Sequence, residues 1–187
     1  MSRPGLTGVH WPPWSGAFHI ELQRISKHPS VMIDIDIPGF KHLKIHHLVL
    51  DYNGTLAIDG LLLDGVARRL RTFSQKIQVH IITADTFGLV KAQIEDLPVK
   101  VTILPSEGLV EAKRDYVFKL GLESVVAIGN GRNDVGMLKD AALGIAVIQR
   151  EGAAVETLLS ADLVVNHILD ALDFLNQPNR LIASLRA

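Results

Sequence analysis

The stretch Val-Leu-Asp-Tyr-Asn-Gly-Thr-Leu-Ala, residues 49–57, joins an apolar run to a carboxylate and a glycine turn. The apolar run before Asp51 is typical of a strand buried in a parallel sheet. An acid at the carboxyl end of such a strand lies where open α/β sheets bind their ligands. Gly54 allows close approach of the backbone to a ligand, and Thr55 adds a hydroxyl. An ordinary acid that caps a turn would give the same pattern, so this stretch alone leaves both interpretations open.

Together with three later stretches, residues 51–55 resemble the four motifs of the haloacid dehalogenase superfamily, to which many phosphatases and the P-type ATPases belong. Residues 81–85, Ile-Ile-Thr-Ala-Asp, resemble its second motif, and Lys113 stands where its lysine belongs. Residues 129–138, Gly-Asn-Gly-Arg-Asn-Asp-Val-Gly-Met-Leu, resemble its fourth motif. The motifs follow in the family's order, and the resemblance covers about residues 43–166.

The resemblance implies phosphoryl transfer with an aspartyl-phosphate intermediate on Asp51. The catalytic group that it implies consists of Asp51, Asn53, Thr83 and Lys113. The phosphate-binding residues that it implies are Gly54 and Ala84 through their amides, Thr55, Thr83 and Lys113. The implied cofactor is Mg²⁺, an ion that prefers oxygen ligands. Its ligands would be Asp51, Asn53 through the backbone carbonyl, Asn130 and Asp134.

Two residues depart from the pattern of the phosphatases. Asn53 replaces the acid that usually follows the nucleophile by two residues, and an amide cannot exchange a proton near neutral pH. Asn130 replaces a carboxylate that ligates Mg²⁺, so metal binding should weaken. Residues 83–85 and 129–134 look most like the versions found in P-type ATPases, which also lack an acid at the position of Asn53. We therefore expect a soluble, P-type-ATPase-like member.

Spacing between the motifs predicts an open site. The separations from Asp51 to Thr83 and from Thr83 to Lys113 are too short for a large nucleotide-binding or cap domain. Members without a cap usually act on large substrates or close the site with a neighbouring subunit. We therefore expect a homo-oligomer, with the subunit edge near the hairpin turn at Asp59-Gly60 and the apolar residues 61–63.

Composition is that of an ordinary globular domain. The chain has 187 residues, 48% of them hydrophobic and 21% charged, which suits one α/β domain. A net charge of −1 gives no reason to expect nucleic acid or an anionic membrane as a partner. The absence of cysteine excludes disulfides and thiolate chemistry, and no apolar run has the length of a membrane span. These features predict a cytoplasmic location.

The rest of the chain predicts an α/β fold with a three-layer, Rossmann-like parallel sheet, helices on both faces, no large cap domain and an extra N-terminal strand. Residues 1–30 are predicted to be a poorly ordered arm or extension, and residues 31–187 a single domain. The extra strand is expected at 31–37, followed by a turn at Pro38-Gly39 and the strand that carries Asp51. Further strands are expected at 77–83, 99–104, 124–129, 145–148 and 162–165. Helices are expected at 65–75, 86–95, 107–120, 133–142, 152–160, 170–175 and 179–185.

Two helices and the histidines give finer expectations. In the helix at 65–75, Val66, Leu70 and Phe73 form the apolar stripe, and in that at 107–120 the inward residues are Leu109, Val110, Val117 and Leu120. His46 and His47 are adjacent on a strand, so they point to opposite faces and cannot chelate one metal. His80 is expected to be a core histidine.

The leading hypothesis is a Mg²⁺-dependent phosphatase that acts through Asp51 on a phosphorylated substrate of unknown identity, and that is slow because of Asn53. A non-catalytic phosphate-binding or regulatory module, or a receiver-like switch with phosphorylated Asp51 as its signal, is the alternative.

Overall fold

The computed structural model describes residues 32–84 and 90–187. Its centre is a six-stranded parallel sheet in the order β10-β9-β8-β3-β6-β7. The strands are β3 (His47–Asp51), β6 (Gln78–Thr83), β7 (Lys100–Ile103), β8 (Val125–Gly129), β9 (Leu143–Val147) and β10 (Leu163–Val165). The predicted α/β fold with a Rossmann-like parallel sheet is confirmed.

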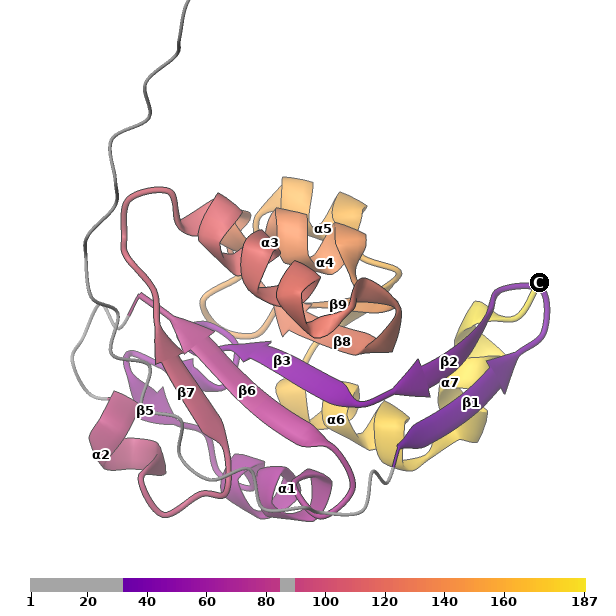
Figure 1. The fold of residues 1–187 in the computed structure, drawn as a ribbon, viewed down its shortest axis with the longest axis horizontal. Coiled ribbons are helices and arrows are strands. Elements are labelled where there is room, and N and C mark those ends of the chain that lie inside the picture. The colour runs from indigo at the N-terminus through magenta and orange to yellow at the C-terminus, as the bar shows by residue number, and fades with distance from the viewer. Residues whose placement is uncertain (1–31, 85–89) are drawn as a thin grey trace, which may run out of the picture.

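Helices cover both faces of the sheet (Figure 1). One layer contains α3 (Leu109–Leu120), α4 (Val135–Asp140) and α5 (Val155–Ser160), and the other contains α1 (Val66–Phe73) and α6 (Ile168–Asn176). The remaining helices are α2 (Val90–Ile94), α7 (Pro178–Leu185) and the 3₁₀ turns η1 (Leu122–Ser124) and η2 (Arg132–Asp134). Pro178 opens α7, where its missing N–H costs nothing.

Two packed cores, one on each face, explain why the central strand β3 is apolar at consecutive positions. In β3, Leu48 and Leu50 pack into the core under α1 and α6, whereas Val49 packs into the core under α3 and α4. All three side chains have no solvent exposure. Burial on both faces requires apolar residues at consecutive positions, which is the pattern that the sequence shows before Asp51.

The inner faces of α1 and α3 differ in how well the sequence predicts them. The predicted stripe of Val66, Leu70 and Phe73 is fully buried in α1. In α3 the prediction for Val110 is wrong, because that side chain is 37% exposed. The fully buried residues of α3 are Lys113 and Val117, so an ammonium group occupies an inward position that apolar periodicity does not predict.

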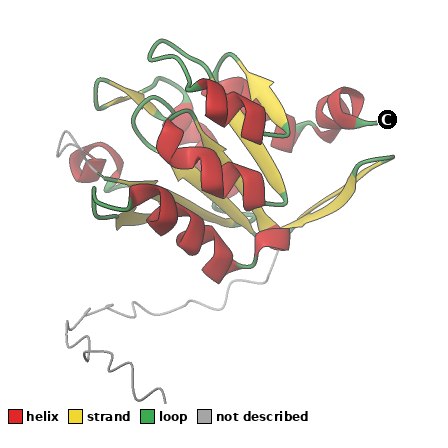
Figure 2. Ribbon diagram, turned by 90° about the horizontal axis from the view of Figure 1, so that it is seen from above, coloured by secondary structure: helices red, strands yellow, loops and turns green. Residues whose placement is uncertain are grey.

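The segment before β3 is a hairpin rather than a single extra strand. β1 (Ile33–Ile37) and β2 (Lys41–Ile45) pair antiparallel in a sheet of their own. The chain then breaks at His46, whose N–H donates to the carbonyl of Ser124 at 2.9 Å, before β3 begins. Viewed from above, the hairpin extends away from the central sheet toward the C-terminus (Figure 2). Its turn, at the predicted Pro38-Gly39 position, accepts a hydrogen bond from the N–H of Ala187.

Between β3 and β6 the chain forms a small hairpin and α1. The hairpin consists of β4 (Ala57–Ile58) and β5 (Leu61–Leu62), turned at Asp59-Gly60 as predicted. The predictions for residues 1–30 and for the start of the helix at 86–95 lie outside the described residues. Within residues 32–84 and 90–187, no helix has the length and apolarity that crossing a lipid bilayer would require.

Candidate active site

Residues of three motifs lie where neighbouring strands of the sheet end. β3 lies between β6 and β8, with Leu50 in register with Ile81 on one side and Ile128 on the other. Because the three strands are parallel, Asp51, Thr83 and Asn130 come to the same edge of the sheet. Ala84 follows β6 directly and is half-buried, and its neighbour Asp85 lies outside the described residues.

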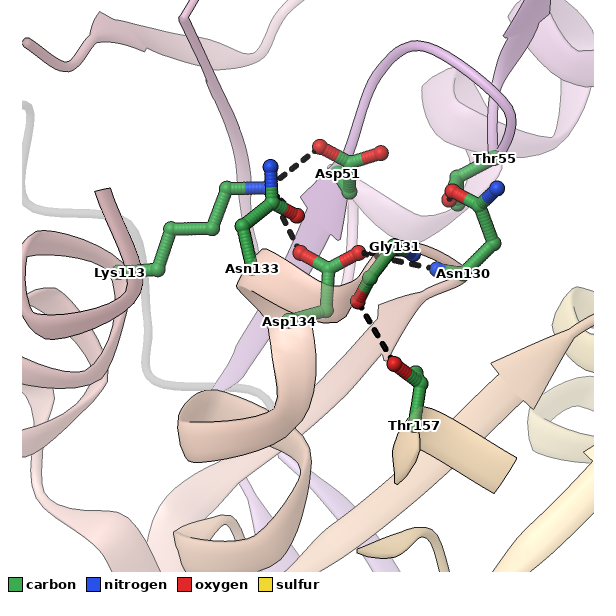
Figure 3. Close-up of polar contacts among 8 residues, drawn as sticks. All are labelled: Asp51, Thr55, Lys113, Asn130, Gly131, Asn133, Asp134 and Thr157. Carbon is green, nitrogen blue, oxygen red and sulfur yellow. Dashed lines mark hydrogen bonds and ion pairs between the residues drawn. The ribbon is translucent and has the colours of Figure 1, made fainter. Parts of the chain in front are cut away.

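The centre of the site is a buried ammonium group between two carboxylates (Figure 3). The Nζ atom of Lys113 lies 2.5 Å from Oδ1 of Asp51 and 2.6 Å from Oδ1 of Asp134. Asn133 Oδ1 accepts a longer hydrogen bond from the same ammonium group, at 3.4 Å. Lys113 and Asp134 are fully buried, and Asp51 is 6% exposed. Lys113 therefore joins the first and fourth motifs from the helix α3.

The electrostatics of this cluster leave one negative charge in excess. Burial raises the pKa of Asp51 to about 6, and Asp134 adds to the rise while Lys113 opposes it. Burial alone would lower the pKa of Lys113, but the two carboxylates outweigh burial and hold that pKa above its ordinary value. Lys113 therefore remains protonated, and its single positive charge faces two carboxylates.

The turn after β8 holds Asp134 in place. Oδ2 of Asp134 accepts the backbone N–H groups of Asn130 and Gly131, both at 2.9 Å. A Cβ atom at Gly129 would lie 2.5 Å from the Asp134 carboxyl carbon, so only glycine fits there. Thr157 supports the turn by donating its hydroxyl to the Gly131 carbonyl at 2.7 Å. Both oxygens of Asp134 are consequently engaged within the protein.

The side chains of Thr55 and Asn130 form a hydrogen bond with each other. The Thr55 hydroxyl donates to Oδ1 of Asn130 at 3.2 Å, and Nδ2 of Asn130 donates to the Gly152 carbonyl at 2.9 Å. A Cβ atom at Gly54, whose φ is +77°, would lie 2.3 Å from the Asn130 amide nitrogen. The phosphate role predicted for Thr55 and the metal role predicted for Asn130 would each have to share or break this contact.

The turn after Asp51 is held by hydrogen bonds of its own. The Tyr52 carbonyl accepts the N–H groups of Thr55 and of the next two residues, and the Gly54 N–H donates to the Ala57 carbonyl at 2.8 Å. Phosphate binding by the Gly54 amide, as predicted, would therefore compete with Ala57. Within the described residues, the Asn53 Oδ1 atom is buried and has no hydrogen-bond partner. Buried acceptors are normally satisfied, which indicates that this one faces a donor or cation that binds there.

The donor atoms at this site are of the type that a hard cation prefers. Asp51, the backbone carbonyl of Asn53 and the amide oxygens of Asn53 and Asn130 are all oxygen donors, as Mg²⁺ prefers. The carboxylates around Lys113 and the unsatisfied oxygen of Asn53 each favour a cation at this end of the sheet. Among the described residues there is no group of three or more acidic, histidine or cysteine side chains that could hold a metal. Asp134 fits better as a neighbour than as a direct ligand, because its oxygens are engaged.

A loop that the sequence motifs do not include also contacts the site. Nε2 of Gln149 donates to the carbonyls of Gly54 and Thr55, at 3.0 Å and 2.6 Å. The Asn130 carbonyl accepts the Ala154 N–H at 3.0 Å, so the segment 149–154 touches both the first and the fourth motifs. No sequence signal identifies Gln149, because it lies between a predicted strand and a predicted helix without any motif.

Comparisons with known proteins find one family over part of the chain. A family model described as haloacid dehalogenase-like hydrolase matches residues 114–167, which include the whole fourth motif. An uncharacterised protein of Methanocaldococcus jannaschii, MJ0073, is 55% identical over 64 residues, which are 34% of this chain and 69% of that protein.

Solved structures with a similar fold include two phosphatases. The cobalt-bound deoxy-D-mannose-octulosonate 8-phosphate phosphatase of Haemophilus influenzae has a TM-score of 0.59 and 17% identity, over 71% of this chain and 88% of that one. The 3-deoxy-D-manno-octulosonate 8-phosphate phosphatase of Moraxella catarrhalis, in complex with a magnesium ion, a phosphate ion and a KDO molecule, has a TM-score of 0.56 and 18% identity, over 76% of this chain and 94% of that one. At these identities the likeness concerns the fold. Over residues 114–167 the matched family model identifies the chain as a haloacid dehalogenase-like hydrolase, and the fold agrees with this.

Proposed function

We propose that this chain is a phosphatase that hydrolyses phosphate esters or anhydrides through an aspartyl phosphate on Asp51. The observation that carries the proposal is the buried Lys113 between Asp51 and Asp134. A buried lysine with two carboxylate partners is costly to maintain for packing alone. At the ligand-binding edge of a parallel sheet, it suits the neutralisation of a nucleophile and a phosphate.

In the first step, an oxygen of ionised Asp51 attacks phosphorus and the bond from phosphorus to the leaving-group oxygen breaks. With a pKa of about 6, Asp51 is ionised and nucleophilic at neutral pH. Lys113 holds its charge at that pH and offsets the negative charge that gathers around the phosphate. The hydroxyl of Thr83 and the amide of Ala84, at the end of β6, would hold phosphate oxygens.

In the second step, water attacks phosphorus, inorganic phosphate leaves, and the Asp51 carboxylate is restored. Asn53 stands where the phosphatases of the family place an acid, and its amide neither protonates a leaving group nor activates water. Such a group typically contributes a hundredfold to ten-thousandfold to the rate. The proposed enzyme is therefore slow, and it favours leaving groups that depart without a proton, such as those of aryl or acyl phosphates.

The proposed cofactor is a divalent metal, with Mg²⁺ as the natural choice for oxygen donors. Asp51, the backbone carbonyl of Asn53 and the amide oxygens nearby would hold it, and it would supply positive charge beside the phosphate. One solved structure of similar fold contains magnesium and another cobalt. We also propose that the site lacks a cap, because only the β4–β5 hairpin and α1 lie between Asp51 and Thr83. The likeness to P-type ATPases rests on the motifs alone and remains a prediction.

A receiver-like switch is the second candidate, and Asn53 is the observation that favours it. Without a group to activate water, the phosphorylated form of Asp51 would persist. A persistent phosphoryl group on a central strand could alter the surrounding surface and act as a signal.

The test is hydrolysis of p-nitrophenyl phosphate by the full chain with Mg²⁺, with Asp51→Asn as the blank. We expect slow turnover that the variant lacks while it melts near the wild-type temperature. Intact-mass measurement after incubation with acetyl phosphate follows the phospho-enzyme. A stable phospho-enzyme without turnover would favour the switch, and the absence of both would overturn the assignment of Asp51 as nucleophile.

A further inference from the structure

The side chain of Gln149 uses its whole carboxamide to tie the turn after Asp51 to another part of the chain. Its Nε2 donates one hydrogen bond to Gly54 and one to Thr55, and its Oε1 accepts the N–H of Ile168 at 3.2 Å. Ile168 is the first residue of α6, which packs against the central sheet. Gln149 therefore connects the nucleophile turn to a fixed element of the core.

The backbone of Gln149 is held in a conformation that glutamine rarely adopts. Its φ is +44°, in the left-handed region, which costs on the order of 1 kcal/mol for a residue with a side chain. The surrounding structure maintains it: its N–H donates to Asn166 and its carbonyl accepts the N–H of Gly152. Glycine would adopt this φ without strain, but it has no amide to offer to the turn.

No other side chain reproduces these contacts. Glutamate has the same length but, when ionised, has no donor for the carbonyls of Gly54 and Thr55. Asparagine has the same group but is shorter by one methylene. The requirement for two donors and one acceptor at this reach therefore selects glutamine.

The neighbours of Gln149 reach the rest of the site from the same segment. Oε1 of Glu151 accepts the N–H of Asp59 in the β4–β5 hairpin at 3.0 Å. The carbonyl of Gly152 accepts the amide of Asn130 in the fourth motif. The segment 149–154 thus contacts the first motif, the fourth motif and the hairpin beside them. Gln149 is the member that reaches the turn after Asp51.

We propose that Gln149 is a positioning residue. It fixes the position of the Gly54-Thr55 turn, and through the turn it orients Asp51 and the Asn53 carbonyl toward the phosphate. It touches no reacting atom and acts through the turn. The proposal rests on the proposed phosphatase function. A displacement of a reacting group by about 1 Å can cost a hundredfold in rate, so loss of the clamp should reduce kcat.

The test compares the full chain with Gln149→Glu, Gln149→Asn and a matched control, Gln93→Glu. Gln93 also contacts the hairpin, but it accepts the Leu62 N–H through Oε1, which glutamate retains. Hydrogen–deuterium exchange of the backbone amides of residues 52–57 should quicken about tenfold in both Gln149 variants. Exchange in the core strand at 125–129 should stay unchanged, and Gln93→Glu should match the wild type.

Hydrolysis of p-nitrophenyl phosphate gives the second readout. We expect kcat to fall about tenfold to a hundredfold in the Gln149 variants, with KM within about twofold of the wild type. Unchanged exchange at 52–57, or unchanged kcat, would overturn the positioning role. If the wild-type chain itself is inactive, the proposed function fails, while the exchange measurement still decides whether Gln149 holds the turn. If Gln149→Glu does not fold, the neutral Gln149→Asn variant carries the comparison.

Discussion

The Nζ atom of Lys113 lies 2.5 Å from the Oδ1 atom of Asp51, and both side chains are withdrawn from solvent. The pair joins α3 to the end of the central strand β3, and Asp134 completes it from the turn after β8. Charge neutralisation and the tertiary structure around the proposed nucleophile therefore depend on the same ammonium group.

Replacing Lys113 by methionine should impair both stability and activity. The change leaves Asp51 and Asp134 buried without their cation, and breaking a buried ion pair in this way typically costs about 3–5 kcal/mol. Urea denaturation should show that loss in the free energy of unfolding, and p-nitrophenyl phosphate hydrolysis should fall to the Asp51→Asn blank. Lys119→Met, on the exposed side of the same helix, is the matched control and should change neither quantity. A Lys113→Met protein of wild-type stability would contradict the assigned ion pairs.

Replacing Asn53 by aspartate should raise turnover and shorten the life of the phospho-enzyme. A carboxylic acid at this position can protonate the leaving group and then activate water, and the backbone carbonyl remains available to a metal. The gain should be largest for alkyl phosphates, whose leaving groups need a proton. Steady-state hydrolysis and intact-mass detection of phosphorylated protein measure the two effects. A wild-type rate equal to that of Asn53→Asp on an alkyl phosphate would show that Asn53 does not limit the reaction.

The Asn53→Asp comparison needs a control for deamidation, because Asn53-Gly54 and Asn130-Gly131 are both Asn-Gly pairs. Conversion of Asn53 to aspartate in the sample would imitate the variant. In the structure the N–H groups of Gly54 and Gly131, which would attack in deamidation, donate to Ala57 and Asp134. We therefore expect both pairs to be slow to deamidate in the folded protein, and peptide mass spectrometry of each assay sample checks this.

Acid should destabilise the protein through a pair of histidines, the buried His80 and the half-buried His47. His80 is 1% exposed; one ring nitrogen contacts His47 at 3.1 Å and the other contacts the Tyr116 hydroxyl at 2.9 Å. Burial, with His47 and Lys100 nearby, lowers the pKa of His80 to about 3. Burial, followed by His46 and Lys100, also lowers the pKa of His47.

These pKa values are lower in the folded state than the ordinary histidine pKa of 6.5, so protonation of the rings favours the unfolded chain. The free energy of unfolding is therefore highest above pH 6.5, and it falls as the pH decreases toward about 3, the pKa of His80 in the folded protein. His80 contributes a slope of up to about 1.4 kcal/mol per pH unit in that window, and His47 adds to the slope below pH 6.5. Urea denaturation from pH 7 to 4 should give a flatter profile for His80→Gln than for the wild type, and a flatter one still when His47→Gln is added. Parallel profiles for all three proteins would contradict a neutral His80.

We propose that the chain forms a homo-oligomer, a dimer or tetramer, whose subunit edge lies near the β4–β5 hairpin. Leu61 on this hairpin is 58% exposed, while Leu62 and Leu63 are half-buried, so the apolar surface is narrower than the sequence predicts. Multi-angle light scattering at micromolar concentration should give a mass above that of one chain, and Leu61→Glu should reduce it. Val164→Glu, an exposed apolar residue on the edge strand β10, is the comparison and should leave the mass unchanged. A monomeric mass for the wild type would remove this proposal.

The order of elements and the candidate residues follow from the sequence, because both depend on local pattern. Consecutive apolar residues before Asp51 require a strand covered on both faces, and such strands alternate along the chain with amphipathic helices. The acid, amide and hydroxyl side chains that follow β3, β6 and β8 then lie at one edge of the sheet. The sequence predicts one strand where the structure has the β1–β2 hairpin. No local pattern marks the break between β2 and β3 at His46, because this break depends on a hydrogen bond to the distant Ser124.

Apolar periodicity and motif spacing along the chain are enough to predict the strand that ends in Asp51, the parallel sheet around it and the resemblance to the family. The pairing of the polar atoms, in contrast, follows from the packing of distant segments. Lys113 and Asp134 close the cluster around Asp51, Thr55 pairs with Asn130, and Gln149 reaches Gly54 across 95 positions of sequence. Such pairings depend on which segments the packed core brings together, and a side chain without a partner nearby in sequence gives no local sign of them.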